Sequence, residues 1–88
     1  MRYSVARLCG GKALMVSPRE PYDIDIEKAA GILSKTSEIK SADGVMLVIM
    51  WKGMEVTIYA NGKIMFHPLE DRNTAISYAN ELMTVLSG

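Results

Sequence analysis

The sequence predicts an α+β fold in which a curved antiparallel sheet carries two helices, both packed on one of its faces. Strand-like apolar segments at 45–51 and 54–60 are separated only by Lys52-Gly53, and a third segment follows Asn61-Gly62. Such short connections predict hairpins. Apolar residues recur at helical spacing before and after this meander, at 23–39 and 71–86. The expected order is one or two strands, a helix, three strands and a second helix.

The chain begins with a predicted hairpin. Residues 3–9 are expected to form a strand, Gly10-Gly11 a turn, and residues 12–17 the returning strand. One long bent strand is the alternative interpretation. The prolines of segment 18–21 then end regular structure.

The first helix is predicted over residues 23–39. Asp23 or Asp25 can cap it by accepting backbone N–H bonds, and Glu27 adds negative charge near the positive helix end. Gly31 lowers helix stability by roughly 1 kcal/mol relative to alanine, so its presence beside two alanines predicts a close approach to the sheet. A loop is expected at 40–44.

The last three strands are predicted at 45–51, 54–60 and 63–67. The Asn61-Gly62 pair is expected to form a type I′ turn, which needs positive φ at both central positions. Pro68 ends the third strand, and Asp71 caps a helix that runs to about Leu86. The buried stripe of this helix is expected to consist of Ala75, Ala79, Leu82, Met83 and Leu86.

Alternation along the strands assigns side chains to the two faces of the sheet. The sets without a polar member are expected under the helices: Met46, Val48 and Met50, then Val56, Ile58 and Ala60, then Ile64 and Phe66. The opposite face then exposes large apolar groups, which predicts a binding or dimerisation surface. The N-terminal segment or segment 18–21 folding over this face is the alternative. The candidate binding residues are Leu47, Ile49, Trp51, Thr57, Tyr59, Met65 and His67.

Length and composition predict one soluble domain over residues 1–88. Ten basic residues balance ten acidic ones, so the net charge gives no general attraction to nucleic acid. Cys9 is the only cysteine, which excludes an intrachain disulfide. The longest apolar run, 45–51, is far too short to cross a bilayer, and no signal peptide is recognisable. A cytoplasmic protein without membrane contact is expected.

Several segments together resemble one repeat of the TATA-binding protein: 24–30 (IDIEKAA), 48–50 (VIM), 58–65 (IYANGKIM) and 78–79 (YA). The resemblance covers most of residues 13–87. It implies a half-repeat fold, which a homodimer would complete into a saddle. It also implies DNA binding by the open sheet face, with Tyr59 at one position of the wedging phenylalanines and Val45 near the other. The basic flanks of that family are absent here, so DNA binding is not the favoured function.

Catalytic and metal-binding patterns are weak in this sequence. His67 is the only histidine, and its pairing with Cys9 would depend on folding alone. Asp23 and Asp25 form a D-x-D pattern that helix capping already explains. The glycines before Lys12 lack the rest of a phosphate-binding loop, and no hydrolase, dithiol or zinc-protease motif occurs. The sequence therefore predicts no enzyme, no cofactor and no metal.

The favoured function is a non-catalytic binding module. It is expected to bind itself, as a homodimer, or another protein through the apolar sheet face, where aromatic side chains are efficient interface anchors. Nucleic-acid binding is the alternative, with Trp51 and Tyr59 as stacking platforms. A small apolar ligand is a further possibility.

Overall fold

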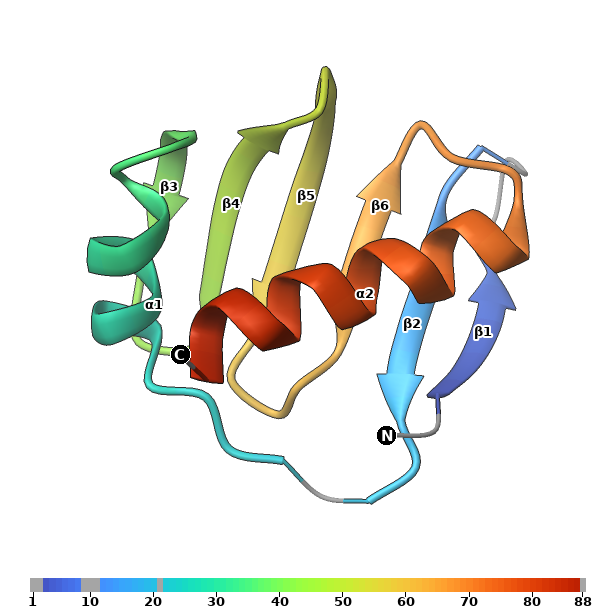
Figure 1. The fold of residues 1–88 in the computed structure, drawn as a ribbon, viewed down its shortest axis with the longest axis horizontal. Helices are drawn as coiled ribbons and strands as arrows, with labels where there is room; N and C mark the ends of the chain where they lie inside the picture. Colours follow the sequence, from blue (N-terminus) through green and yellow to red (C-terminus); the bar gives the residue numbers. More distant parts are fainter. Residues whose placement is uncertain (1–2, 9–11, 21, 88) are drawn as a thin grey trace.

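The fold is an antiparallel sheet of six strands with two helices on one face, in strand order β1-β2-β6-β5-β4-β3 (Figure 1). The computed structural model describes residues 3–8, 12–20 and 22–87. The predicted α+β class is confirmed. The elements are β1 (Tyr3–Arg7), β2 (Leu14–Pro18), α1 (Ile26–Leu33), β3 (Glu38–Ala42), β4 (Met46–Trp51), β5 (Met54–Tyr59), β6 (Ile64–His67) and α2 (Arg72–Ser87).

The N-terminal segment forms a hairpin. Strands β1 and β2 pair antiparallel from Tyr3 opposite Pro18 to Arg7 opposite Leu14, so the alternative of one bent strand is wrong. The predicted turn at 10–11 and the strand end at Cys9 lie outside the described residues. Strand β2 also pairs with β6, which extends the sheet sideways. The described part of this segment therefore adds edge strands and does not fold over the open face.

The first helix is shorter than predicted. Asp25 caps α1 by accepting the backbone N–H of Lys28 at 3.2 Å. The helix ends at Leu33, whose carbonyl accepts the N–H groups of both Thr36 and Ser37. The Ser34 hydroxyl also donates to the Gly31 carbonyl at 3.0 Å, a local side-chain bond of the kind that competes with helix continuation. Residues 38–42 form the edge strand β3, so the predicted helix to residue 39 and the predicted loop at 40–44 were wrong.

Of the two hairpin turns in the meander, the type I′ turn is the first one, at Lys52-Gly53, and not the one at Asn61-Gly62 where it was predicted. Lys52 and Gly53 both have positive φ, 51° and 78°, which defines a type I′ turn. At the second turn only Gly62 has positive φ, 94°. The Gly62 N–H donates to the Tyr59 carbonyl and the Tyr59 N–H donates to the Lys63 carbonyl, both at 2.9 Å. This is a three-residue loop with a glycine bulge, so the predicted type I′ turn at Asn61-Gly62 was wrong.

Helix α2 begins where the sequence predicts. Asp71 accepts the backbone N–H of Asn73 at 3.2 Å and the hydroxyl of Thr74 at 2.6 Å. The predicted buried stripe is confirmed for Ala75, Ala79, Leu82 and Met83, and Leu86 is half-buried. In Figure 1 this helix begins beside β1 and β2 and crosses the front of the sheet to end near α1, which lies over β3.

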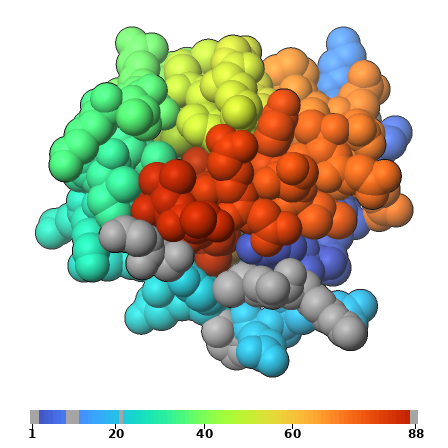
Figure 2. Space-filling model, viewed as in Figure 1, coloured from blue at the N-terminus to red at the C-terminus, as the bar shows by residue number. Residues whose placement is uncertain are grey.

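The core lies between the sheet and the helix layer. Ala29 and Leu33 of α1 are buried in the same apolar cluster as Phe66 of β6 and Leu82 of α2. Figure 2 shows atoms of both helices spread over this side of the sheet. Gly31 is exposed, and no heavy atom outside its own helix and chain neighbours would lie within 4 Å of an added Cβ. The predicted close approach at Gly31 was therefore wrong.

Candidate binding surface on the open sheet face

The two faces of strand β4 are reversed relative to the prediction. Leu47 pairs with Ile58, Ile49 with Val56, and Trp51 with Met54, and all of these partners lie in the core beneath the helices. Leu47 and Ile49 are fully buried. The three candidate binding residues Leu47, Ile49 and Trp51 therefore belong to the covered face. Met46, Val48 and Met50, which were expected under the helices, lie on the open face.

Trp51 is part of an aromatic cluster on the helix side. Its ring meets that of Tyr78 edge-to-face, with centroids 5.2 Å apart and an interplanar angle of 89°. The buried ring of Phe66 lies 6.3 Å away. Trp51 is consequently not available to the open face.

The other candidate residues lie on the open face as expected. Thr57 pairs with Val48 on one side and with Met65 on the other, and Glu55 pairs with His67. Met65 is in turn opposite Met15 of β2. Tyr59 pairs with Met46. These pairings place one continuous row of side chains across four neighbouring strands.

The centre of the open face is apolar and rich in methionine. We call it the methionine patch, which consists of Met15, Met46, Val48, Met50, Tyr59 and Met65. It holds four of the seven methionines in the chain, and all its members are half-buried. Thr57, at its centre, is only 3% exposed, because its neighbours close over it.

Four members of the patch were missed from the sequence: Met15, Met46, Val48 and Met50. The signal for the three in β4 is the two-residue turn Lys52-Gly53, because the residues that flank such a turn pair with each other and share a face. Trp51 therefore follows Met54 to the covered side, and alternation sends Met50 to the other. Met15 is assigned by the same alternation, since Leu14 and Val16 are buried.

Charged and polar side chains surround the patch at the two ends of the strands. Glu38, Glu55 and His67 lie at one end and Lys63 at the other, and the Lys40 side chain extends from the middle of β3 to Glu55. The Lys40 ammonium lies 3.5 Å from the Glu55 carboxylate, with both side chains close to half-exposed. A pair in this environment contributes little to stability, about 1 kcal/mol or less. These groups form a polar rim with both signs of charge.

One backbone carbonyl on the outer edge of β1 is occupied by a side-chain donor. Leu8 N–H donates to the Ala13 carbonyl, and by antiparallel alternation the carbonyl of Val5 then points away from β2. The guanidinium of Arg72 donates to this carbonyl at 2.6 Å. Such occupancy protects an edge from pairing with another strand.

The opposite edge, β3, is irregular. Its register with β4 shifts between Ile39 and Ser41, so Lys40 lies at a bulge. Bulges and lysines on edge strands both disfavour sheet extension. The face of the sheet is therefore more accessible to a partner than either edge.

The loop before β4 is held by one carboxylate. Asp43 accepts the backbone N–H of Val45 at 2.8 Å and that of Met46 at 3.0 Å. These two bonds hold the pKa of Asp43 below its usual range. Val45, which the resemblance placed near a wedge position, lies in this loop and is 64% exposed.

The described residues contain no group of three or more histidine, cysteine, aspartate or glutamate side chains that could hold a metal ion. Asp25 of the D-x-D pattern caps α1. Cys9, the possible partner of His67, lies outside the described residues. Within the described ranges, neither helix has the length and apolar character needed to span a membrane.

Comparison of the chain with protein-family models, with curated proteins and with solved structures finds no match. The geometry of the open sheet face is therefore the basis of the functional proposal.

Proposed function

We propose that this chain is a non-catalytic binding module that forms a homodimer by pairing the methionine patches of two copies. The observation that carries the proposal is an apolar sheet face that no described element covers. The Val5 carbonyl occupied by Arg72 at the β1 edge and the bulge at the β3 edge favour this face over side-by-side joining of two sheets.

The area of the face agrees with a reversible dimer. The whole open face, which includes the methionine patch, its polar rim and the edge strands β1 and β3, consists of six strands of about five residues and spans roughly 29 Å by 17 Å at the usual strand spacing and rise. Two copies would together bury about 1,000 Å², which is the lower limit for a specific interface. We therefore expect a dissociation constant in the micromolar range, as for other small interfaces.

The charges around the patch suit a second copy of the same chain. A two-fold axis that runs across the strands would place the end of one protomer that carries Glu38, Glu55 and Lys40, with one more negative than positive charge, on the Lys63 end of its partner. Opposite charges at the rim fix orientation more than affinity. Methionine side chains add flexibility, so the two patches can adapt to each other at the centre.

DNA binding resembling that of a TATA-binding-protein repeat remains the alternative function. The described open face carries Glu38 and Glu55 as well as Lys40 and Lys63, so it offers no excess of positive charge for phosphates. We expect no binding to an A·T-rich duplex at physiological salt. A complex whose affinity falls steeply with salt would favour the alternative and would also support the proposed half-repeat relationship.

Sedimentation over a concentration series tests the dimer. We expect the wild-type chain to be monomeric at about 1 µM and largely dimeric at about 500 µM. Val48→Glu places an unpaired charge at the centre of the interface and should abolish the dimer. Val85→Glu is the matched control, since Val85 is 43% exposed on α2, on the other side of the sheet. A wild-type monomer at the highest concentration would refute the proposal, as would equal behaviour of the two variants.

A further inference from the structure

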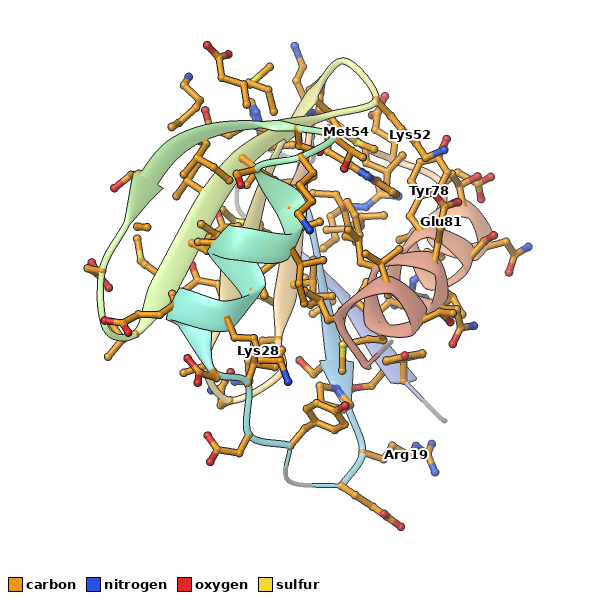
Figure 3. The ribbon with its side chains drawn as sticks, turned by 60° about the vertical axis from the view of Figure 1, so that its left-hand side comes forward. Arg19, Lys28, Lys52, Met54, Tyr78 and Glu81 are labelled. Atoms are coloured by element: carbon orange, nitrogen blue, oxygen red, sulfur yellow. The ribbon has the colours of Figure 1, made fainter. Side chains whose placement is uncertain are left out.

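The ammonium group of Lys52 lies against two aromatic rings where the β4–β5 turn meets α2. Its Nζ atom is 4.9 Å from the ring centroid of Trp51 and 5.2 Å from that of Tyr78. Both distances are within the range of a cation–π interaction. The carboxylate of Glu81, one helical turn from Tyr78, lies 3.3 Å from the same nitrogen. Figure 3 shows Lys52, Tyr78 and Glu81 together at this corner of the molecule.

The rings are held in place by the core. Trp51 and Tyr78 meet at 89°, so their faces form two walls of a corner. Phe66, which is fully buried, lies 6.3 Å from Trp51 and 6.1 Å from Tyr78. Trp51 and Tyr78 are themselves half-buried, which anchors each ring and leaves part of it accessible. The walls of the site are thus preorganised before any ligand binds.

The cation in this corner is held less firmly than the rings. The Lys52 side chain is 41% exposed and that of Glu81 is 51% exposed, so water weakens their ion pair. Lys52 also has a φ of 51°, at a turn position where asparagine and glycine are preferred. Neither the turn nor the core requires a lysine here. The lysine side chain can therefore leave the corner without disturbing the fold.

We propose that Trp51, Tyr78 and Glu81 form a binding site for a quaternary ammonium group, and that Lys52 occupies this site in the free protein. A primary ammonium is strongly hydrated and loses water when it packs on a ring. A methylated ammonium keeps its charge, is less strongly hydrated and presents methyl groups to both rings, which is the chemistry that aromatic cages recognise. Glu81 supplies the opposite charge. An external ligand of this kind displaces Lys52.

This site is independent of the proposed dimer, because it lies on the helix side of the sheet and the methionine patch lies on the other. Each proposal can fail without affecting the other.

Fluorescence provides a direct test, since Trp51 is the only tryptophan in the chain. We expect tetramethylammonium chloride to change its emission saturably, while sodium chloride at equal ionic strength does not. Lys52→Asn removes the internal competitor and suits the turn, so it should tighten binding roughly two- to five-fold, the range of an exposed cation–π contact. Lys40→Asn, a matched change on the open face, should leave the affinity unchanged.

Two further variants separate cation–π binding from a general structural effect. Tyr78→Phe keeps the ring and should retain affinity, whereas Tyr78→Leu should weaken binding several-fold while circular dichroism shows the fold intact. Choline, phosphocholine and Nε-trimethyllysine, titrated in parallel, then identify the source of the ammonium group by the tightest binding. A response to tetramethylammonium no different from that to sodium would overturn the proposal. So would an unchanged affinity in Lys52→Asn.

Discussion

The covered and open faces of the sheet are made from alternate residues of the same strands, yet they differ in chemistry. The covered face is built from leucine, isoleucine, valine and phenylalanine that are fully buried, such as Leu47, Ile49 and Phe66. The open face holds half-buried methionines around Thr57. Rigid, branched side chains specify one packing arrangement, whereas methionine adapts to several. The covered face thus defines the fold, and the open face is suited to a partner.

Strand β4 contains this difference within six residues. Both of its sets are apolar, a pattern typical of strands that are covered on both sides. The helices supply cover on one side only. A second copy of the chain would supply the missing layer.

Alanine substitutions at neighbouring positions of β4 should show the largest difference in the free energy of unfolding. Leu47→Ala leaves a cavity beneath the helices, and we expect the free energy of unfolding to fall by about 3 to 4 kcal/mol. Val48→Ala removes fewer buried atoms, so the loss should be about 1 kcal/mol or less. Urea denaturation of both variants at low protein concentration gives the two values. Equal losses would contradict the assignment of faces.

The turn between β5 and β6 maintains the register that separates the two faces. An added Cβ at Gly62 would lie 2.9 Å from the Cβ of Tyr22 and 3.0 Å from the Cγ of Pro18, and the φ of 94° disfavours any side chain. We expect Gly62→Ala to lower the free energy of unfolding by about 2 kcal/mol or more. If Gly62→Ala unfolded at the same urea concentration as the wild type, the close contacts described at this turn would be contradicted.

Gly31, an exposed residue of α1, provides the opposite case. It lies in α1 with open space around an added Cβ, so alanine removes unfolded-state freedom without a clash. Gly31→Ala should raise the free energy of unfolding by about 0.5 to 1 kcal/mol in the same urea experiment. Destabilisation would indicate a contact that limits space at this position.

The smallest effect is expected from pH at the start of β4. The backbone bonds from Val45 and Met46 lower the pKa of Asp43 in the folded chain, so the carboxylate contributes stability above its unfolded-state pKa. That contribution is lost as the pH falls through the lowered, folded-state pKa. Asp43→Asn keeps an acceptor oxygen without the titration, and thermal unfolding below about pH 5 should then depend less on pH. If Asp43→Asn showed the same dependence of thermal stability on pH as the wild type, the Asp43 carboxylate would contribute nothing to stability.

Sequence patterns were sufficient for the elements whose signals are local. The caps at Asp25 and Asp71, the apolar stripe of α2 and the three-strand meander could all be predicted. Strand β3 could not, because its residues are mostly exposed and its pairing with β4 depends on contacts distant in sequence.

The candidate site could be predicted only in part. Thr57, Tyr59, Met65 and His67 follow from polar neighbours that mark the solvent side of their strands. In β4 no polar residue distinguishes the faces, so composition alone favoured the wrong set. Recognising a type I′ turn at Lys52-Gly53 would have corrected the assignment of the β4 faces. The proposed cation site was missed because Tyr78 and Glu81 join Trp51 and Lys52 only through tertiary packing.

Methyl NMR of the methionines tests the central claim, that the open face pairs with a second copy, most directly. Met15, Met46, Met50 and Met65 lie in the patch, while Met54 and Met83 are buried on the covered side and serve as internal controls. In a dilution series of the chain labelled at methionine methyl groups, the four patch signals should shift together with one dissociation constant. The two control signals should stay in place. Patch signals that do not move with concentration, or that move no more than the controls, would contradict the account.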